Sequence, residues 1–117
     1  MTSNTSLYMT PEALLSFNMD LTRVEIFESP ESYPIRFGLL LDVKNSVNKS
    51  DFKVVCYNEE YKIYNKHDFC IIGYFISSNE YLEYILISQL RSITDTSIDK
   101  IKKYLDNEEE YFYFKRA

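Results

Sequence analysis

The chain has 117 residues, a length that supports one domain with one hydrophobic core. Hydrophobic residues make up 45% and aromatic residues 16% of the chain, which excludes intrinsic disorder. The formal net charge of -5 disfavours direct binding to nucleic acid or to an anionic membrane, because phosphate neutralisation requires clustered Lys and Arg.

The N-terminal part of the chain predicts one short helix. Residues 1–9 are polar, and we expect them to be flexible. Thr10 followed by Pro11 is typical of a helix start, because Thr caps free N–H groups and Pro fits the first turn. We expect this helix to end near Asn18.

Two strands follow, separated by a turn at 29–34 that contains two prolines. Apolar and polar residues alternate over 21–28, which predicts a half-exposed strand. The segment 35–43 is more apolar and predicts a more fully buried strand. Gly38 inside it indicates a β-bulge or a close approach of another backbone.

Further strands are predicted in the middle of the chain, over 52–57 and 61–65. A polar turn at 58–60 would join them as a hairpin. The segment 69–76 is rich in aromatic and β-branched residues, which is typical of a strand covered on both faces. We expect the core to form around this last segment.

The segment 79–93 is compatible with two structures. Apolar residues at helical spacing, such as Leu82, Leu86 and Leu90, favour a helix. Read with a period of two, the same segment alternates as a strand, and 77–79 would then form a hairpin turn. The spacing slightly favours the helix, and both alternatives stay open.

The C-terminal part predicts one more helix, which opens over 95–99. Thr96 is the expected N-cap, with Asp99 at the capping-box position. The acidic segment 107–110 ends this helix. The aromatic residues 111–114 form either an added edge strand or an aromatic flap.

These elements predict a single α+β domain that spans residues 1–117. We expect a mostly antiparallel sheet of five or six strands. A short N-terminal helix and a C-terminal helix would cover one face of it. The segment 79–93 would add a further helix if the helical alternative holds.

Several kinds of chemistry are excluded by the composition. Both glycines, Gly38 and Gly73, lie inside apolar segments, so no Gly-rich phosphate-binding loop exists. A single His and two widely spaced Cys do not form a zinc pattern. We therefore expect no metal, no cofactor and no catalytic residue.

The sharpest enzymatic alternative is a thiol nucleophile. Cys70 follows His67 and Asp68 closely, and an imidazole can hold a thiolate in reach of a substrate. However, Cys70 begins an apolar strand, and we expect it to pack as a small hydrophobic residue. The same expectation holds for Cys56, which lies between Val55 and Tyr57.

Paired carboxylates are the other enzymatic alternative. Glu59 with Glu60, and Glu80 with Glu83, are the candidate pairs. Each pair falls in a polar turn or on an exposed face, where carboxyl groups titrate ordinarily and do little acid–base work. We expect these residues to be solvated.

The sequence also predicts a cytoplasmic location. The first nine residues have no basic residue and no apolar run, so they do not form a signal peptide. Glu80 and Glu83 interrupt the best candidate for a membrane span. We expect both thiols to be reduced.

The most promising binding site is the acidic and aromatic segment near the C-terminus. We expect Glu108, Glu109 and Glu110 to steer a basic partner at long range. Tyr111 and Tyr113 would then supply the buried contacts of the complex. The alternative is a helix end that only improves solubility.

A small, acidic, aromatic chain without a catalytic constellation has the profile of an antagonist that blocks a partner by contact. We expect a non-enzymatic immunity or inhibitor protein that neutralises a basic partner such as a toxin nuclease. Alternatives are a small homodimeric secretion chaperone and a phage-encoded inhibitor that mimics nucleic acid. The oligomeric state stays open, with a monomer slightly favoured.

Overall fold

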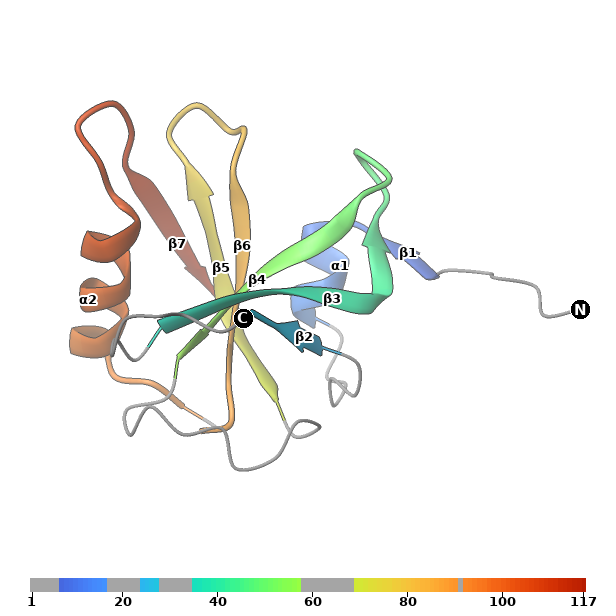
Figure 1. Cartoon of the computed structure of the whole chain (residues 1–117), viewed down its shortest axis with the longest axis horizontal. Coiled ribbons are helices and arrows are strands. Elements are labelled where there is room, and N and C mark those ends of the chain that lie inside the picture. The colour runs from blue at the N-terminus through green and yellow to red at the C-terminus, as the bar shows by residue number, and fades with distance from the viewer. Residues whose placement is uncertain (1–6, 17–23, 28–34, 58–68, 91) are drawn as a thin grey trace, which may run out of the picture.

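A curled, mixed β-sheet forms the body of the molecule (Figure 1). The computed structural model describes residues 7–16, 24–27, 35–57, 69–90 and 92–117, with Asp42 described by its backbone alone. Within these ranges the sheet has seven strands in the order β1-β3-β4-β6-β5-β7, with β2 paired to β3. The strands are β1 (Leu7–Met9), β2 (Val24–Ile26), β3 (Ile35–Asn45), β4 (Asp51–Tyr57), β5 (Cys70–Ser77), β6 (Glu83–Ser88) and β7 (Phe112–Arg116).

The sheet is larger and more mixed than the sequence predicts. Strands β1 and β3 pair in parallel, and so do β4 and β6, whereas the other pairs are antiparallel. The α+β class is confirmed. The parallel pair β4–β6 joins strands that are far apart in the chain, a pairing that local patterns do not indicate.

The expected helix over 79–93 is wrong, because residues 83–88 form strand β6 between β4 and β5. Ile85, Leu86 and Ile87 are all buried, because both faces of β6 are covered. Ile85 and Ile87 pack on the α1 side of the sheet, and Leu86 packs on the α2 side. A strand buried on both faces shows no alternation, so its spacing resembles that of a helix. The hairpin alternative is confirmed.

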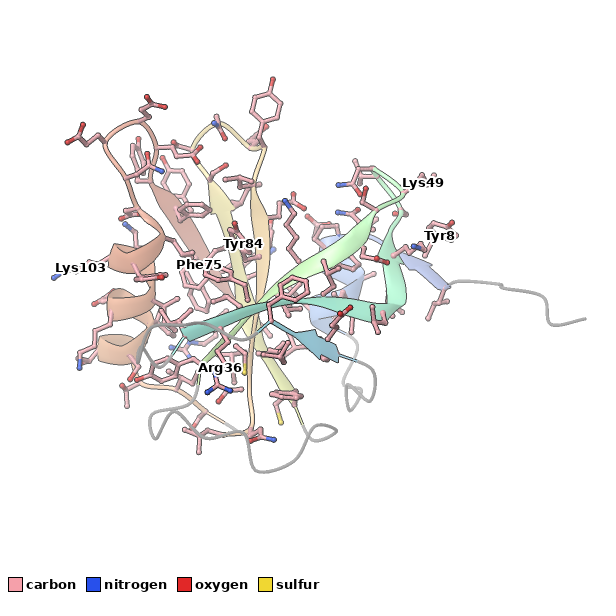
Figure 2. The ribbon with its side chains drawn as sticks, in the orientation of Figure 1. Tyr8, Arg36, Lys49, Phe75, Tyr84 and Lys103 are labelled. Carbon is pink, nitrogen blue, oxygen red and sulfur yellow. The ribbon has the colours of Figure 1, made fainter. Side chains whose placement is uncertain are left out.

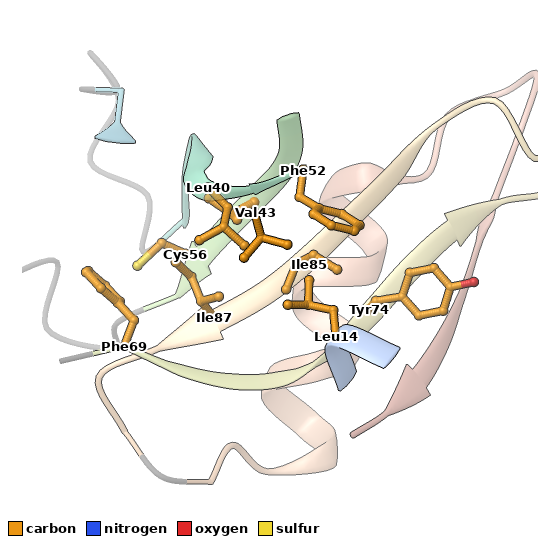
Figure 3. Packing of buried hydrophobic residues seen from close by; sticks show 10 residues of the cluster. Leu14, Leu40, Val43, Phe52, Cys56, Phe69, Tyr74, Ile85 and Ile87 are labelled. Atoms are coloured by element: carbon orange, nitrogen blue, oxygen red, sulfur yellow. The ribbon is translucent and has the colours of Figure 1, made fainter. Parts of the chain in front are cut away.

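The two helices, α1 (Pro11–Ser16) and α2 (Asp95–Leu105), cover opposite faces of the sheet rather than one. Leu14 of α1 packs with Ile85 of β6 on one face (Figure 3). Ile98 and Ile101 of α2 pack on the other face. The expectation of one covered face is therefore wrong. A strand buried on both faces needs cover from both sides.

The helix starts agree with the sequence only in part. Thr10 caps α1, since its Oγ1 accepts a hydrogen bond from the backbone N–H of Ala13 at 3.1 Å. The cap of α2 is Thr94, which accepts from the N–H of Ser97 at 3.2 Å. Thr96, the expected cap, lies within the helix. Two threonines stand two residues apart, so sequence spacing cannot distinguish them.

The remaining sequence predictions concern one glycine, the N-terminus, a hairpin and membrane spans. Gly38 is the site of a close approach, because a Cβ there would meet the carbonyl oxygen of Glu25 on β2. Residues 7–9 form β1, although the sequence predicts flexibility over 1–9. The strand expected over 61–65 and its turn at 58–60 lie outside the described ranges. Neither helix of the described part is long and apolar enough to cross a membrane.

Candidate protein-binding site

Two loops that are far apart in the sequence meet at one end of the molecule (Figure 1). One is the β5–β6 turn, residues 78–82, and the other is the α2–β7 loop, residues 106–111. The N–H of Ser78 donates to the carbonyl oxygen of Tyr111 at 2.7 Å, and the N–H of Tyr111 donates to Ser78 Oγ at 3.3 Å. These bonds hold the two loops side by side.

The α2–β7 loop is fixed by its own hydrogen bonds. Asn107 Oδ1 accepts from the N–H groups of Glu109 and Glu110 at 2.9 and 3.0 Å. Asp106 Oδ1 accepts from the N–H of Phe112 at 2.8 Å, which joins the end of α2 to the start of β7. The acidic segment is therefore an ordered turn rather than a frayed helix end.

The β5–β6 turn is fixed in a similar way. Ser77 Oγ accepts from the N–H of Leu82 at 3.0 Å, and Asn79 Oδ1 accepts from the N–H of Tyr81 at 3.1 Å. Glu80 adopts a left-handed backbone with φ of 65°. The tip of the turn presents Tyr81, whose side chain is 87% exposed.

The aromatic run is an edge strand with two different sides, which confirms the strand alternative over the flap. Phe112 is buried, and the Phe114 ring packs on Phe75 with centroids 4.8 Å apart. Tyr111 and Tyr113 point the other way and are 52% and 54% exposed. Their rings meet edge to face at 5.4 Å. A hydrogen bond with Tyr111 is the main cause that raises the pKa of Tyr113.

The three predicted glutamates separate in the structure. Glu108 and Glu109 are exposed at the tip of the α2–β7 loop. Glu110 is half-buried, and its Oε2 is shielded from water with no hydrogen-bond partner in the part of the chain described. Burial raises the pKa of Tyr84, and the charge of Glu110 raises it further. Tyr84 pairs with Phe75 across β6 and β5 (Figure 2).

We call the resulting surface the tyrosine–glutamate rim. It combines the exposed acids and tyrosines of both loops and of the start of β7: Glu80, Tyr81, Glu108, Glu109, Tyr111 and Tyr113. The sequence did not indicate that Glu80 and Tyr81 belong with the C-terminal residues. Their only local signal is the Ser-Ser-Asn turn, which acquires this meaning once 79–93 is read as a strand.

The thiols have the environment expected of packed hydrophobic residues. Cys56 is buried on β4, and this burial raises the pKa of its thiol to about 12, so it stays protonated at neutral pH. Cys70 is half-buried and packs against the core on the α2 side. His67 and Asp68 lie outside the described residues.

The expectation of solvated carboxylates is wrong for Glu83, which is half-buried and hydrogen-bonded on β6. Glu83 Oε2 accepts a hydrogen bond from Asn45 Nδ2 at 3.3 Å, whereas Glu80 is exposed on the turn. Burial, and to a smaller extent the charges of Glu12 and Glu80, raise the pKa of Glu83, while the bond from Asn45 lowers it. Glu59 and Glu60 lie outside the described ranges.

Two further observations concern metal binding and similarity to known proteins. In the described part of the chain, no group of three or more His, Cys, Asp or Glu side chains is arranged to hold a metal ion. Comparison of the chain with protein-family models, curated proteins and solved structures found no match.

Proposed function

We propose that this protein is a non-enzymatic antagonist, an immunity or inhibitor protein that binds and neutralises a basic protein such as a toxin nuclease. One observation carries this proposal. Hydrogen bonds join two loops so that exposed tyrosines and exposed glutamates form one surface, the tyrosine–glutamate rim.

The composition of the rim supports contact with a basic partner. Glu108 and Glu109 are exposed and carry charge of one sign, which speeds the encounter with an oppositely charged surface. Tyr111 and Tyr113 support each other through ring contact and present large side chains with little rotamer freedom to lose.

The order of the two loops supports the same proposal. Asn107, Asn79 and Ser77 already bond the backbone of the turns in the free protein. A partner then meets a surface whose ordering cost is small, which raises affinity without any new contact.

The test is affinity capture with variants on and off the rim. Wild-type protein, the Glu108→Gln/Glu109→Gln variant and a Lys103→Gln control are immobilised and exposed to lysate of the native host. We expect one stoichiometric basic protein on wild type and on the control, because Lys103 is exposed on α2 away from the rim. The double variant should retain less of it.

The captured protein is then purified and assayed for cleavage of plasmid DNA. An equimolar amount of wild-type protein should abolish cleavage. The proposal fails if no stoichiometric partner appears, or if the partner binds the rim variant and wild type equally at low salt. Turnover of a small molecule by the purified chain would also overturn it.

A second candidate is the homodimeric secretion chaperone, which needs an apolar surface on the folded protein. Phe27 at the end of β2, Leu41 on β3 and Tyr104 on α2 are large exposed apolar residues. A chaperone holds an extended effector segment on such a surface. Binding of an unfolded basic effector peptide, undiminished by Tyr111→Ala, would favour this candidate.

A further inference from the structure

Four aromatic rings from four elements meet near the C-terminal end of α2. The ring of Phe37 on β3 lies 5.5 Å from the ring of Tyr84 on β6 and 6.3 Å from the ring of Tyr104 on α2, between centroids. Tyr84 in turn lies 5.9 Å from Phe112 of β7. Phe112 is buried, whereas Phe37 and Tyr84 are half-buried and Tyr104 is exposed. The first three rings therefore reach the surface.

Glu110 lies beside this group of rings. Its charge contributes, after burial, to the raised pKa of Tyr84, so the carboxylate is near that phenol. The backbone of Glu110 is fixed, because its N–H donates to Asn107 Oδ1 at 3.0 Å and its carbonyl oxygen accepts from the N–H of Asn107 at 2.9 Å. We call Phe37, Tyr84, Tyr104 and Glu110 together the Glu110 site.

One carboxylate oxygen of Glu110 lacks a donor. Its Oε2 is shielded from water and accepts no hydrogen bond from the described part of the chain. Two basic residues of the adjoining elements are paired elsewhere, since Lys102 lies 2.7 Å from Asp106 and Arg116 lies 2.6 Å from Asp95. A shielded carboxylate without a donor costs free energy. A cation from outside the described chain would pair this charge.

The unpaired oxygen can meet a ligand without a change of backbone. Glu110 as a whole is half-buried, so part of its side chain reaches the surface. The last torsion of a glutamate side chain is soft, and a half-turn about it exchanges the two oxygens. A group that reaches the exposed part of Glu110 can therefore pair with either oxygen.

An arginine side chain matches both parts of the Glu110 site. Its guanidinium is planar, carries several N–H donors and stacks on aromatic rings, so it can bind the carboxylate and a ring at once. A lysine ammonium is more strongly hydrated and has no flat face to stack. A neutral ligand would leave the charge of Glu110 unpaired.

We propose that the Glu110 site binds an arginine side chain of the basic partner. This inference rests on the proposed function, because the rim would bring the partner to the same loop, where Glu110 directly precedes Tyr111. The exposed acids of the rim then act on the approach. The Glu110 site selects a partner that presents arginine at this place.

The first test needs no partner. Protein with isotope-labelled aromatic rings is titrated with N-acetylarginine amide and, separately, with N-acetyllysine amide. The arginine compound should shift the NMR signals of the Tyr84 and Tyr104 rings saturably, at several-fold lower concentration than the lysine compound. Glu110→Gln should remove this saturable shift. Signals that do not shift, or that shift equally for both compounds, would overturn the inference.

The second test uses the captured partner. Glu110→Gln should raise the dissociation constant of the complex about thirty-fold or more, because an arginine buried in the complex loses its counter-charge. The control Lys103→Gln should bind as wild type does, since Lys103 is exposed on the side of α2 away from Tyr84 (Figure 2). A Glu110→Gln protein that binds as tightly as wild type would contradict the inference.

Stability separates a binding role of Glu110 from a structural one. Because Oε2 is unpaired in the free protein, Glu110→Gln should melt no lower than wild type. A variant that melts several degrees lower would make Glu110 a structural residue and overturn the inference.

Failure of this inference is distinct from failure of the proposed function. If no partner is captured, the proposed function fails, and the arginine titration still decides whether the Glu110 site binds arginine. If a partner is captured and Glu110→Gln binds it normally, the proposed function stands and the arginine site is wrong.

Discussion

The tyrosine–glutamate rim and the Glu110 site are neighbouring surfaces on the α2–β7 loop, but their acids differ in exposure. Glu108 and Glu109 stand in water at the tip of this loop, which hydrogen bonds between Ser78 and Tyr111 join to the β5–β6 turn. Glu110 is half-buried, and its Oε2 is shielded and unpaired within the described part of the chain. An exposed acid attracts any cation at long range, whereas a shielded acid beside aromatic rings favours a guanidinium in direct contact.

Each surface also includes a residue of a strand that a glycine holds close to its neighbour. Gly38 follows Phe37 of the Glu110 site, and a Cβ there would meet the backbone of β2. A Cβ at Gly73 would meet the carbonyl oxygen of Lys115 and the Phe114 ring on β7, which carries Tyr113 of the rim. The two glycines therefore keep the strands beside each surface in place.

The largest effect on stability is expected in β7, the strand that carries Tyr113 of the rim. Phe112→Ala removes a ring that is fully buried beside Tyr84, with ring centroids 5.9 Å apart. The free energy of unfolding should fall by about 3–5 kcal/mol, because the substitution leaves a cavity. Urea denaturation measures this loss. A loss below about 1 kcal/mol would contradict the packing of β7 on the core.

The glycine substitutions should have the next largest effect. Gly38→Ala and Gly73→Ala should each lower the free energy of unfolding by about 1–3 kcal/mol, because the new methyl group meets backbone that has to move. Urea denaturation measures both losses. An alanine variant as stable as wild type would contradict the close approach at that glycine.

A substitution at Tyr111 of the rim should weaken partner binding and leave the stability of the fold nearly unchanged. Tyr111→Ala should weaken partner binding by about 2 kcal/mol or more, mainly through faster dissociation, because a short-range anchor is lost. Its melting temperature should stay close to that of wild type, since the side chain is half exposed. Surface plasmon resonance and calorimetry measure the two quantities. An early-melting variant whose folded fraction binds normally would assign Tyr111 to the core.

The acids of the rim should act on the encounter instead. Glu108→Gln/Glu109→Gln should slow association several-fold at low salt, and the difference should shrink at physiological ionic strength, where the Debye length is about 8 Å. Glu110 is left unchanged because it is half-buried. Stopped-flow measurement over a salt series tests this. Equal association rates at low salt would make the loop a solubilising turn.

The smallest effect concerns Glu83, which lies on neither surface. Its pKa is raised, chiefly by burial, so the protonated form is favoured in the folded state. That stabilisation is fully present below the pKa of the unfolded chain and is lost as pH rises through the raised folded value. Glu83→Gln should therefore melt higher than wild type at neutral pH and lose this advantage in acid. Parallel melting curves across pH would contradict it.

Much of the local structure was predictable because it depends on neighbours in the sequence. Thr10 and Pro11 start α1, and β2 lies within the alternating segment 21–28. Gly38 marks the close approach of the β2 backbone. The residues of the proposed C-terminal binding segment were chosen from local composition alone. Only four of the five stand exposed, because Glu110 is half-buried with its Oε2 shielded from water.

The sequence by itself determined the α+β class, most strand positions and the acidic and aromatic character of the C-terminal segment. Tertiary structure alone decided that 83–88 is a strand, since a segment buried on both faces has no period of its own. It also decided that the β5–β6 turn, which carries Tyr81, is hydrogen-bonded to the loop that ends at Tyr111, and that the rings of Phe37 and Tyr84 lie side by side. Those juxtapositions depend on pairing between distant strands, and the free energy of such pairing is not written in any local pattern.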